Sequence, residues 1–156
     1  MDWLLFAVQW LHVLLGVTWF GYAISMYFLV SPAIVAMPED QQRGLFARLG
    51  AIGARVFPFV GISVLVLGFI RGTFLGPIDG VDDVFATAYG ITWLVGLLTT
   101  IALFVTGARL IGPTYESLQT TSAFAETGAR LRRYAAFDLA LFGIVFTCMI
   151  LMRFGL

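Results

Sequence analysis

The only histidine of this 156-residue chain, His12, lies inside an apolar stretch long enough to cross a bilayer. An imidazole in such a place has three common uses, and the sequence leaves them open. It can donate a hydrogen bond to a neighbouring helix, bind the iron of a b-type haem, or bind Cu(I). Gly16 and Trp19 follow on the same helical face. Because Gly16 has no side chain, a flat ligand or a neighbouring helix could approach the imidazole closely. Trp19 is expected either to cover that space or to pack in the core.

A haem site also needs a flat apolar slot and cations for the propionates. Arg71 and Arg153 are predicted at the outer rim of the membrane, on the His12 side, and Trp93 at a similar depth. The residues assigned to haem binding are therefore His12, Gly16, Trp19, Arg71, Trp93 and Arg153. One chain supplies one histidine, so the sixth ligand is a methionine, another group or none, unless a second subunit contributes one.

Sulfur ligands suit Cu(I), and Cys148, Met149 and Met152 fall at a depth compatible with His12. Adjacent helical residues point about 100° apart, so Cys148 and Met149 do not easily bind one ion. Cys148 and Met152 share a face. The copper hypothesis therefore uses His12, Met152 and Cys148, and the simpler interpretation of Cys148 is a small buried hydrophobe.

The inner half of the predicted spans holds a different set of ionisable groups, Arg55, Arg109 and Asp138. A charge inside lipid is costly and normally pairs. We predict a structural ion pair between Asp138 and one of the two arginines. A role of Asp138 in proton movement is the alternative.

These residues must be positioned by membrane helices. The chain is 60 % hydrophobic and only 12 % charged, whereas soluble domains carry about 25 % charged residues. A span needs roughly 20 apolar residues, and four stretches meet that length. The sequence predicts an all-α, integral membrane four-helix bundle that forms a single domain, 1–156, with spans at about 3–30, 56–75, 85–111 and 134–152.

Prolines set the predicted ends of these spans. Ser31-Pro32 is expected to stop the first helix and Gly112-Pro113 the third, because proline disfavours the helical conformation in the residue before it. Between the first two spans, residues 38–55 have helical periodicity with arginines on one face. We predict an amphipathic helix there, lying on the membrane surface, with Pro58 in the first turn of the next span.

The polar stretch 114–133 is expected to form helical turns at the interface. Seven of the nine basic residues, all of them arginine, fall on the side of the two long loops, and only Arg71 and Arg153 on the other. The positive-inside rule then places both termini outside the cell (inner) membrane. The N-terminus lacks the basic region of a cleavable signal, so we expect a retained first span.

Several classes of function are disfavoured by composition. The net charge of zero gives no reason to expect a nucleic-acid partner. The single cysteine excludes an internal disulfide. The lipid bilayer is the expected environment, and a bundle this small predicts a homo-oligomer or a subunit of a membrane complex.

Three short motifs carry a resemblance to a known family. They are Trp10-Leu11-His12 followed by Val17-Thr18-Trp19-Phe20-Gly21, the arginines Arg48 and Arg55 before the second span, and the ending Met149-Ile150-Leu151-Met152-Arg153. Together they resemble the CopD-like membrane family, which includes the copper-resistance CopD domain, small four-helix relatives and HemJ-type protoporphyrinogen oxidases.

This resemblance implies that His12 is the haem-binding histidine of the first helix. HemJ-type proteins also use a lysine on the third helix, but this chain has no lysine and reads Ile91-Thr92-Trp93-Leu94-Val95-Gly96 there. That difference weakens an assignment as a HemJ-type oxidoreductase. The leading expectation is a membrane protein that binds haem b and has an electron-transfer or porphyrin-linked redox role. The alternatives are a copper-handling transporter or resistance protein, and a cofactor-free accessory subunit.

Overall fold

The computed structural model describes residues 2–120 and 124–155, and in these two ranges every long element is a helix and no strand occurs. Four helical stretches are long and apolar enough to cross a membrane: Trp3–Val35, Glu39–Gly72, Ala88–Thr114 and Ala129–Arg153. The predicted all-α fold with four membrane helices is confirmed, and the chain is a multi-pass membrane protein.

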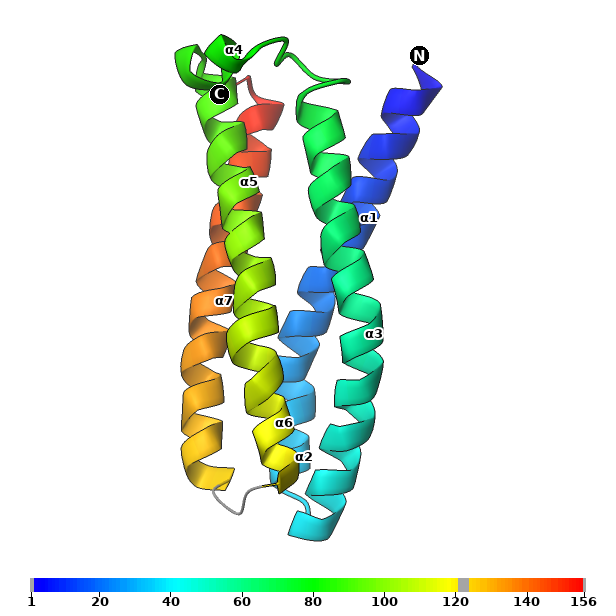
Figure 1. Cartoon of the computed structure of the whole chain (residues 1–156), viewed down its shortest axis with the longest axis vertical. Helices are drawn as coiled ribbons and strands as arrows, with labels where there is room; N and C mark the ends of the chain where they lie inside the picture. Colours follow the sequence, from blue (N-terminus) through cyan, green and yellow to red (C-terminus); the bar gives the residue numbers. More distant parts are fainter. Residues whose placement is uncertain (1, 121–123, 156) are drawn as a thin grey trace.

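The bundle consists of two helical hairpins (Figure 1). Helix α1 (Trp3–Ser25) packs along α3 (Glu39–Gly72), and α5 (Ala88–Thr106) packs along α7 (Phe124–Arg153). Both termini lie at the same end as the short helix α4 (Val81–Ala86), which we call the terminal end. The other end is called the opposite end. Toward its N-terminus α1 leans away from α5 and α7, and α1 contacts α7 over a much shorter length than it contacts α3.

The two predicted stop signals are wrong, because the helix continues through both prolines. A π-helical turn, Met26–Val30, joins α1 to α2 (Ser31–Val35), and a second one, Gly107–Ile111, joins α5 to α6 (Gly112–Thr120). The backbone N–H that follows each π turn donates to the carbonyl five residues earlier. Ser31 donates to Met26, and Gly112 donates to Gly107. Each proline then falls in the first turn of a new helix, where its missing N–H costs little.

The amphipathic stretch 38–55 is helical from Glu39 on, as predicted, but it is wrong to treat it as an element separate from the second span. Residues 39–72 form one uninterrupted helix, α3, and Pro58 lies inside it. Proline removes a single backbone bond, which packing in a bundle can tolerate. The 34 residues give a helix about 50 Å long at 1.5 Å per residue, against a hydrocarbon thickness of about 30 Å. The polar first turns of α3 therefore extend the span beyond the lipid.

The predicted interfacial stretch 114–133 likewise extends helices. Its first part belongs to α6 and its last part to α7, while residues 121–123 lie outside the described ranges. Helix α7 begins ten residues before the predicted span, at Phe124 rather than Tyr134. The opposite end is thus built from long helices rather than from loops.

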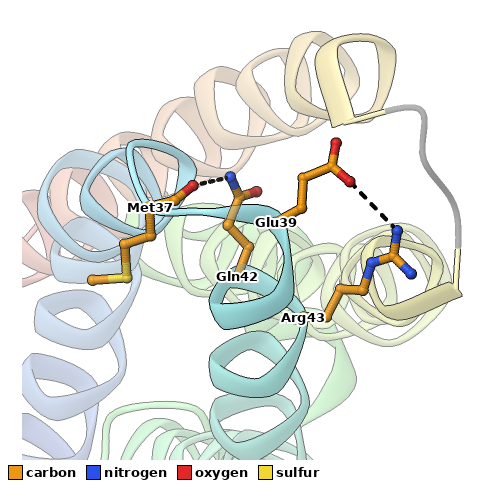
Figure 2. A network of polar contacts seen from close by, with 4 residues as sticks. All are labelled: Met37, Glu39, Gln42 and Arg43. Carbon is orange, nitrogen blue, oxygen red and sulfur yellow. Dashed lines mark hydrogen bonds and ion pairs between the residues drawn. The ribbon is translucent and has the colours of Figure 1, made fainter.

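The connection between α2 and α3 is held by side chains of the first turn of α3 (Figure 2). The Gln42 amide nitrogen donates to the carbonyl of Met37 at 2.6 Å and to that of Val35 at 3.2 Å. Glu39 and Arg43, one turn apart on the outside of the helix, form an ion pair at 3.7 Å. The buried amide fixes the path of the chain, while the exposed pair contributes little.

One hydrophobic cluster is buried toward the opposite end. Ile34, Phe46 and Leu131 form one buried cluster there, with Phe46 and Ile34 each 1 % exposed. Nearer mid-bundle a second cluster forms around Ala23, Leu103 and Phe142. The terminal end is different, because its four helices surround a cavity.

Candidate functional site

A cavity of about 600 Å³ lies between the terminal halves of α1, α3, α5 and α7. This is within the volume range of small-molecule and cofactor sites. Its walls include all eight residues that the sequence assigned to haem or copper: His12, Gly16, Trp19, Arg71, Trp93, Cys148, Met152 and Arg153. The structure therefore brings both predicted ligand sets to one place.

His12 is half-buried, and its position is fixed by the backbone of α3. Its Nδ1 atom lies 3.1 Å from the carbonyl oxygen of Val64. One turn further along α3, a Cβ atom at Gly68 would lie 3.0 Å from Cε1 of His12. The ring thus rests against α3 at a position where a larger residue would displace it.

The protonation of the imidazole follows from this bond. A carbonyl oxygen only accepts hydrogen bonds, so Nδ1 must carry the proton and donate to Val64. In the neutral ring Nε2 is then the unprotonated nitrogen with a free lone pair. A histidine that binds a metal through one nitrogen commonly donates from the other to a backbone carbonyl. The hydrogen bond to Val64 therefore leaves Nε2 as the nitrogen of His12 that is able to bind a metal.

Trp93 contacts the α3 surface next to His12. Its indole N–H donates to the carbonyl of Gly68 at 3.3 Å, and its ring packs directly on Gly72, leaving no room for a side chain there. Gly68 and Gly72, one turn apart, therefore allow two different helices to reach the α3 backbone. Close approach at small residues is a common means of helix packing in membranes.

Gly16 and Trp19 lie where the cavity meets the mid-bundle cluster. Nothing lies within 4 Å of a Cβ atom built at Gly16, which faces the cavity one turn beyond His12. Trp19 packs edge-on against Phe142 with ring centroids 5.6 Å apart. Trp19 is therefore both a cavity wall and part of the mid-bundle cluster, and the open space begins on the His12 side of it.

The two predicted cations differ in how they are held. Arg71 is half-buried, and its guanidinium is hydrogen-bonded by Nε to the Gln9 side-chain oxygen at 3.0 Å and by Nη1 to the Leu75 carbonyl at 3.1 Å. Arg153 also lines the cavity but is exposed. It has no hydrogen bond or ion pair within the described part of the chain.

The sulfur ligands line the α7 side of the cavity. Cys148 is buried, and its Cβ atom would lie 3.4 Å from a Cβ atom placed at Gly96 of α5. This contact makes Cys148 a packing residue between α5 and α7 as well as a cavity wall. Met149 and Met152 are half-buried beside it. Among the described residues no group of three or more His, Cys, Asp or Glu side chains is arranged to hold a metal.

The predicted ion pair of Asp138 with Arg55 or Arg109 is not formed. Asp138 is buried and accepts a hydrogen bond of 2.9 Å from the Tyr27 hydroxyl. Its other oxygen, Oδ1, has no partner among the described residues. Arg55 and Arg109 are exposed instead. Neither arginine has a hydrogen bond or an ion pair within residues 2–120 and 124–155.

Several contacts of the site are not predicted by the sequence. Val64 and Gly68 form the surface on which His12 rests, and Gln9 binds Arg71. Gly68 and Gly72 flank Arg71 at one-turn spacing, which is a signal for close helix contact. Gln9 lies three residues before His12 and thus on its face. These signals indicate a contact surface but do not say which helix meets it.

Comparisons of the chain with protein-family models, with curated proteins and with solved structures find no match. The resemblance to the CopD-like family stays a prediction. A function must therefore be argued from the cavity itself.

Proposed function

We propose that this membrane protein binds haem b in the terminal-end cavity, with His12 as an axial ligand, and has an electron-transfer or porphyrin-linked redox role. The single observation that carries the proposal is the hydrogen bond from Nδ1 of His12 to the Val64 carbonyl, because it leaves Nε2 free as a ligand.

The surroundings of His12 fit the group in three further ways. Gly16 leaves space one turn from the imidazole, and apolar residues supply most of the cavity walls. Arg71 and Arg153 line the same cavity and are the residues to hold propionates. When bound, haem supplies one-electron chemistry whose potential depends on its ligands and on burial. The protein's part is to bind the ring, orient it and limit access of water.

The orientation and assembly belong to this proposal. With seven arginines at the loop side, the cavity lies in the outer half of a cell (inner) membrane and both termini lie outside. A second subunit, in a homo-oligomer or a membrane complex, is the expected source or acceptor of electrons.

Copper handling is the second candidate, favoured by one specific observation. His12, Cys148 and Met152 come from two helices and line one cavity, although Cys148 is also engaged in packing against Gly96. An imidazole, a thiol and a thioether are suitable ligands for Cu(I). A metal analysis separates this candidate from haem.

The test is the absorption spectrum of the detergent-purified protein, produced with ample haem, in the oxidised and dithionite-reduced states. We expect a Soret band that shifts on reduction. His12→Ala and His12→Gln should both lose the band to background. His12→Gln keeps an amide donor for the Val64 carbonyl, so its loss of haem would report ligation rather than folding.

Thr18→Ala is the matched control. Thr18 is exposed on α1 and its hydroxyl bonds only to Leu14 of its own helix at 2.8 Å, so this variant should keep its haem. Normal haem content in His12→Gln would overturn the proposal. A colourless wild-type protein with bound copper would support the second candidate, and one with neither would support an accessory subunit.

A further inference from the structure

Arg71 is oriented by two hydrogen bonds from different parts of the chain. Gln9 on α1 accepts from Nε, and the Leu75 carbonyl, in the turn after α3, accepts from Nη1. A guanidinium has five N–H donors. Nη2 has no hydrogen-bond partner in the described ranges, and Arg71 lines the cavity. The side chain is therefore fixed, with donors left for a ligand.

Among the residues that the structure describes, no carboxylate forms an ion pair with Arg71. Asp2 also lines the cavity, but its side-chain oxygen accepts from the backbone N–H groups of Leu4 and Leu5 at 3.0 and 3.2 Å, as the N-cap of α1. The ion pair of Arg43 with Glu39 lies far from Arg71, at the opposite end. A positive charge facing a mostly apolar cavity without a counter-ion favours an anionic ligand.

Arg153 differs from Arg71 in this respect. It is exposed and has no partner among the described residues, so a ligand would have to order its long side chain. Ordering a flexible side chain reduces affinity, whereas an oriented one avoids that loss. Of the two cations, Arg71 is the one prepared to distinguish a carboxylate from a neutral group.

We propose that Gln9 is a positioning residue that holds the Arg71 guanidinium toward the cavity, so that the site selects planar amphiphiles with a free carboxylate. The choice of a tetrapyrrole as ligand rests on the proposed function. Gln9 acts only through Arg71. It sets the preference between an acid and its ester and does not itself bind the ligand.

The experiment compares iron-free protoporphyrin IX with its dimethyl ester, each titrated into the haem-free protein in the same detergent. Without iron, the readout is independent of ligation by His12. A hydrogen bond to a charged group is typically worth enough for about a tenfold change in affinity. We expect the wild type to bind the acid about tenfold more tightly than the ester. Gln9→Leu should reduce this preference to within about twofold.

Two variants make the readout specific. Arg71→Leu should abolish the preference, whereas Arg153→Leu should retain most of it. Gln41→Leu is the matched control for Gln9→Leu, because Gln41 is exposed at the opposite end, and it should leave the ratio unchanged. A loss of folding alone would lower both affinities and would not change their ratio.

Equal binding of acid and ester by the wild type, no binding of either, or a preference that persists in Gln9→Leu would overturn the inference. The role of Gln9 and the ligation of haem by His12 are tested independently of each other. If His12→Gln keeps its haem while the acid preference depends on Gln9, ligation by His12 is wrong and the role of Gln9 stands. If His12→Gln loses haem while acid and ester bind alike, ligation stands and the role of Gln9 is wrong.

Discussion

The two halves of this bundle use the same four helices differently. At the terminal end the side chains surround a cavity of about 600 Å³, and polar residues such as His12, Gln9 and Arg71 lie on its walls. At the opposite end fully buried side chains such as Ile34 and Phe46 fill the space between helices. Proteins commonly separate a stable part from a part that opens or binds. Here the division follows the membrane normal.

Helix α3 runs through both halves and shows the difference within one element. Near its start Phe46 projects into a cluster with Ile34 and Leu131. Near its end Gly68 and Gly72 have no side chains, and the backbone itself becomes the contact surface for His12 and Trp93. One helix can therefore anchor the core at one end and position ligand-binding groups at the other.

The largest expected loss of stability comes from a substitution in the packed half. Phe46 is 1 % exposed, and Phe46→Ala should lower the free energy of unfolding by about 3–5 kcal/mol, because it removes buried contacts and leaves a cavity. Phe6 is the matched position on the cavity wall. It is 51 % exposed, and Phe6→Ala should cost below about 1 kcal/mol.

The free energies of unfolding of both variants are to be measured by reversible unfolding in mixed micelles, followed by circular dichroism. Equal losses in the two variants would mean that the halves do not differ in packing. A loss in Phe6→Ala larger than that in Phe46→Ala would reverse the comparison.

The next effect concerns Asp138, a buried carboxylate of the opposite half. Tyr27→Phe removes the hydroxyl that donates to Asp138 at 2.9 Å, and should cost about 1–3 kcal/mol because a buried acceptor loses its partner. Adding Asp138→Leu should recover part of this loss, since replacing both partners by apolar groups removes the unpaired atom. The same unfolding assay gives the coupling between the two sites as a double-mutant cycle.

If Tyr27→Phe left stability unchanged, or if the double variant were less stable than either single variant, the hydrogen bond would have no structural role. If the double variant regains stability, the fold does not require a carboxylate at position 138. Asp138 would then be a packing position of the stable half.

The helices were predictable from the sequence, while their ends were not. Long apolar stretches identify spans because lipid tolerates little else. Ser31-Pro32 and Gly112-Pro113 predict helix ends because local propensity disfavours helix before proline. In the structure a π turn before each of them lets the helix resume. The change from α-helical to π-helical hydrogen bonding depends on how the whole chain packs. A rule based on local sequence does not predict it.

The site was predictable to a similar degree. Spacing on one helix places Gly16 and Trp19 with His12, and depth places Arg71 and Cys148 near them. All eight residues assigned to haem or copper therefore line the cavity, although most of its other lining residues are not predicted. The bonds of His12 to Val64 and of Gln9 to Arg71 required the knowledge that α1 packs on α3. Depth alone also failed for Asp138, whose partner is a tyrosine across the bundle rather than an arginine at the same level.

The smallest expected change in stability tests the binding half most directly. Gly68→Ala places a Cβ atom 3.0 Å from Cε1 of His12, so the imidazole must move by a few tenths of an ångström. Gly143 lies on α7 with nothing within 4 Å of its Cβ position, which makes Gly143→Ala the matched control. Alanine favours helix over glycine by about 0.5–1 kcal/mol, so both variants should unfold within about 1 kcal/mol of the wild type.

Haem binding should separate these two alanine variants. A shift of the group that orients a metal ligand typically costs 10-fold or more in affinity, so Gly68→Ala should bind haem about tenfold more weakly. Gly143→Ala should bind it as the wild type does. Titration of haem into the apoprotein, followed at the Soret band, gives both constants. Equal affinity of the two variants would mean that the contact of His12 with α3 does not set the ligand's position, and the binding half would then be a cavity without an oriented histidine.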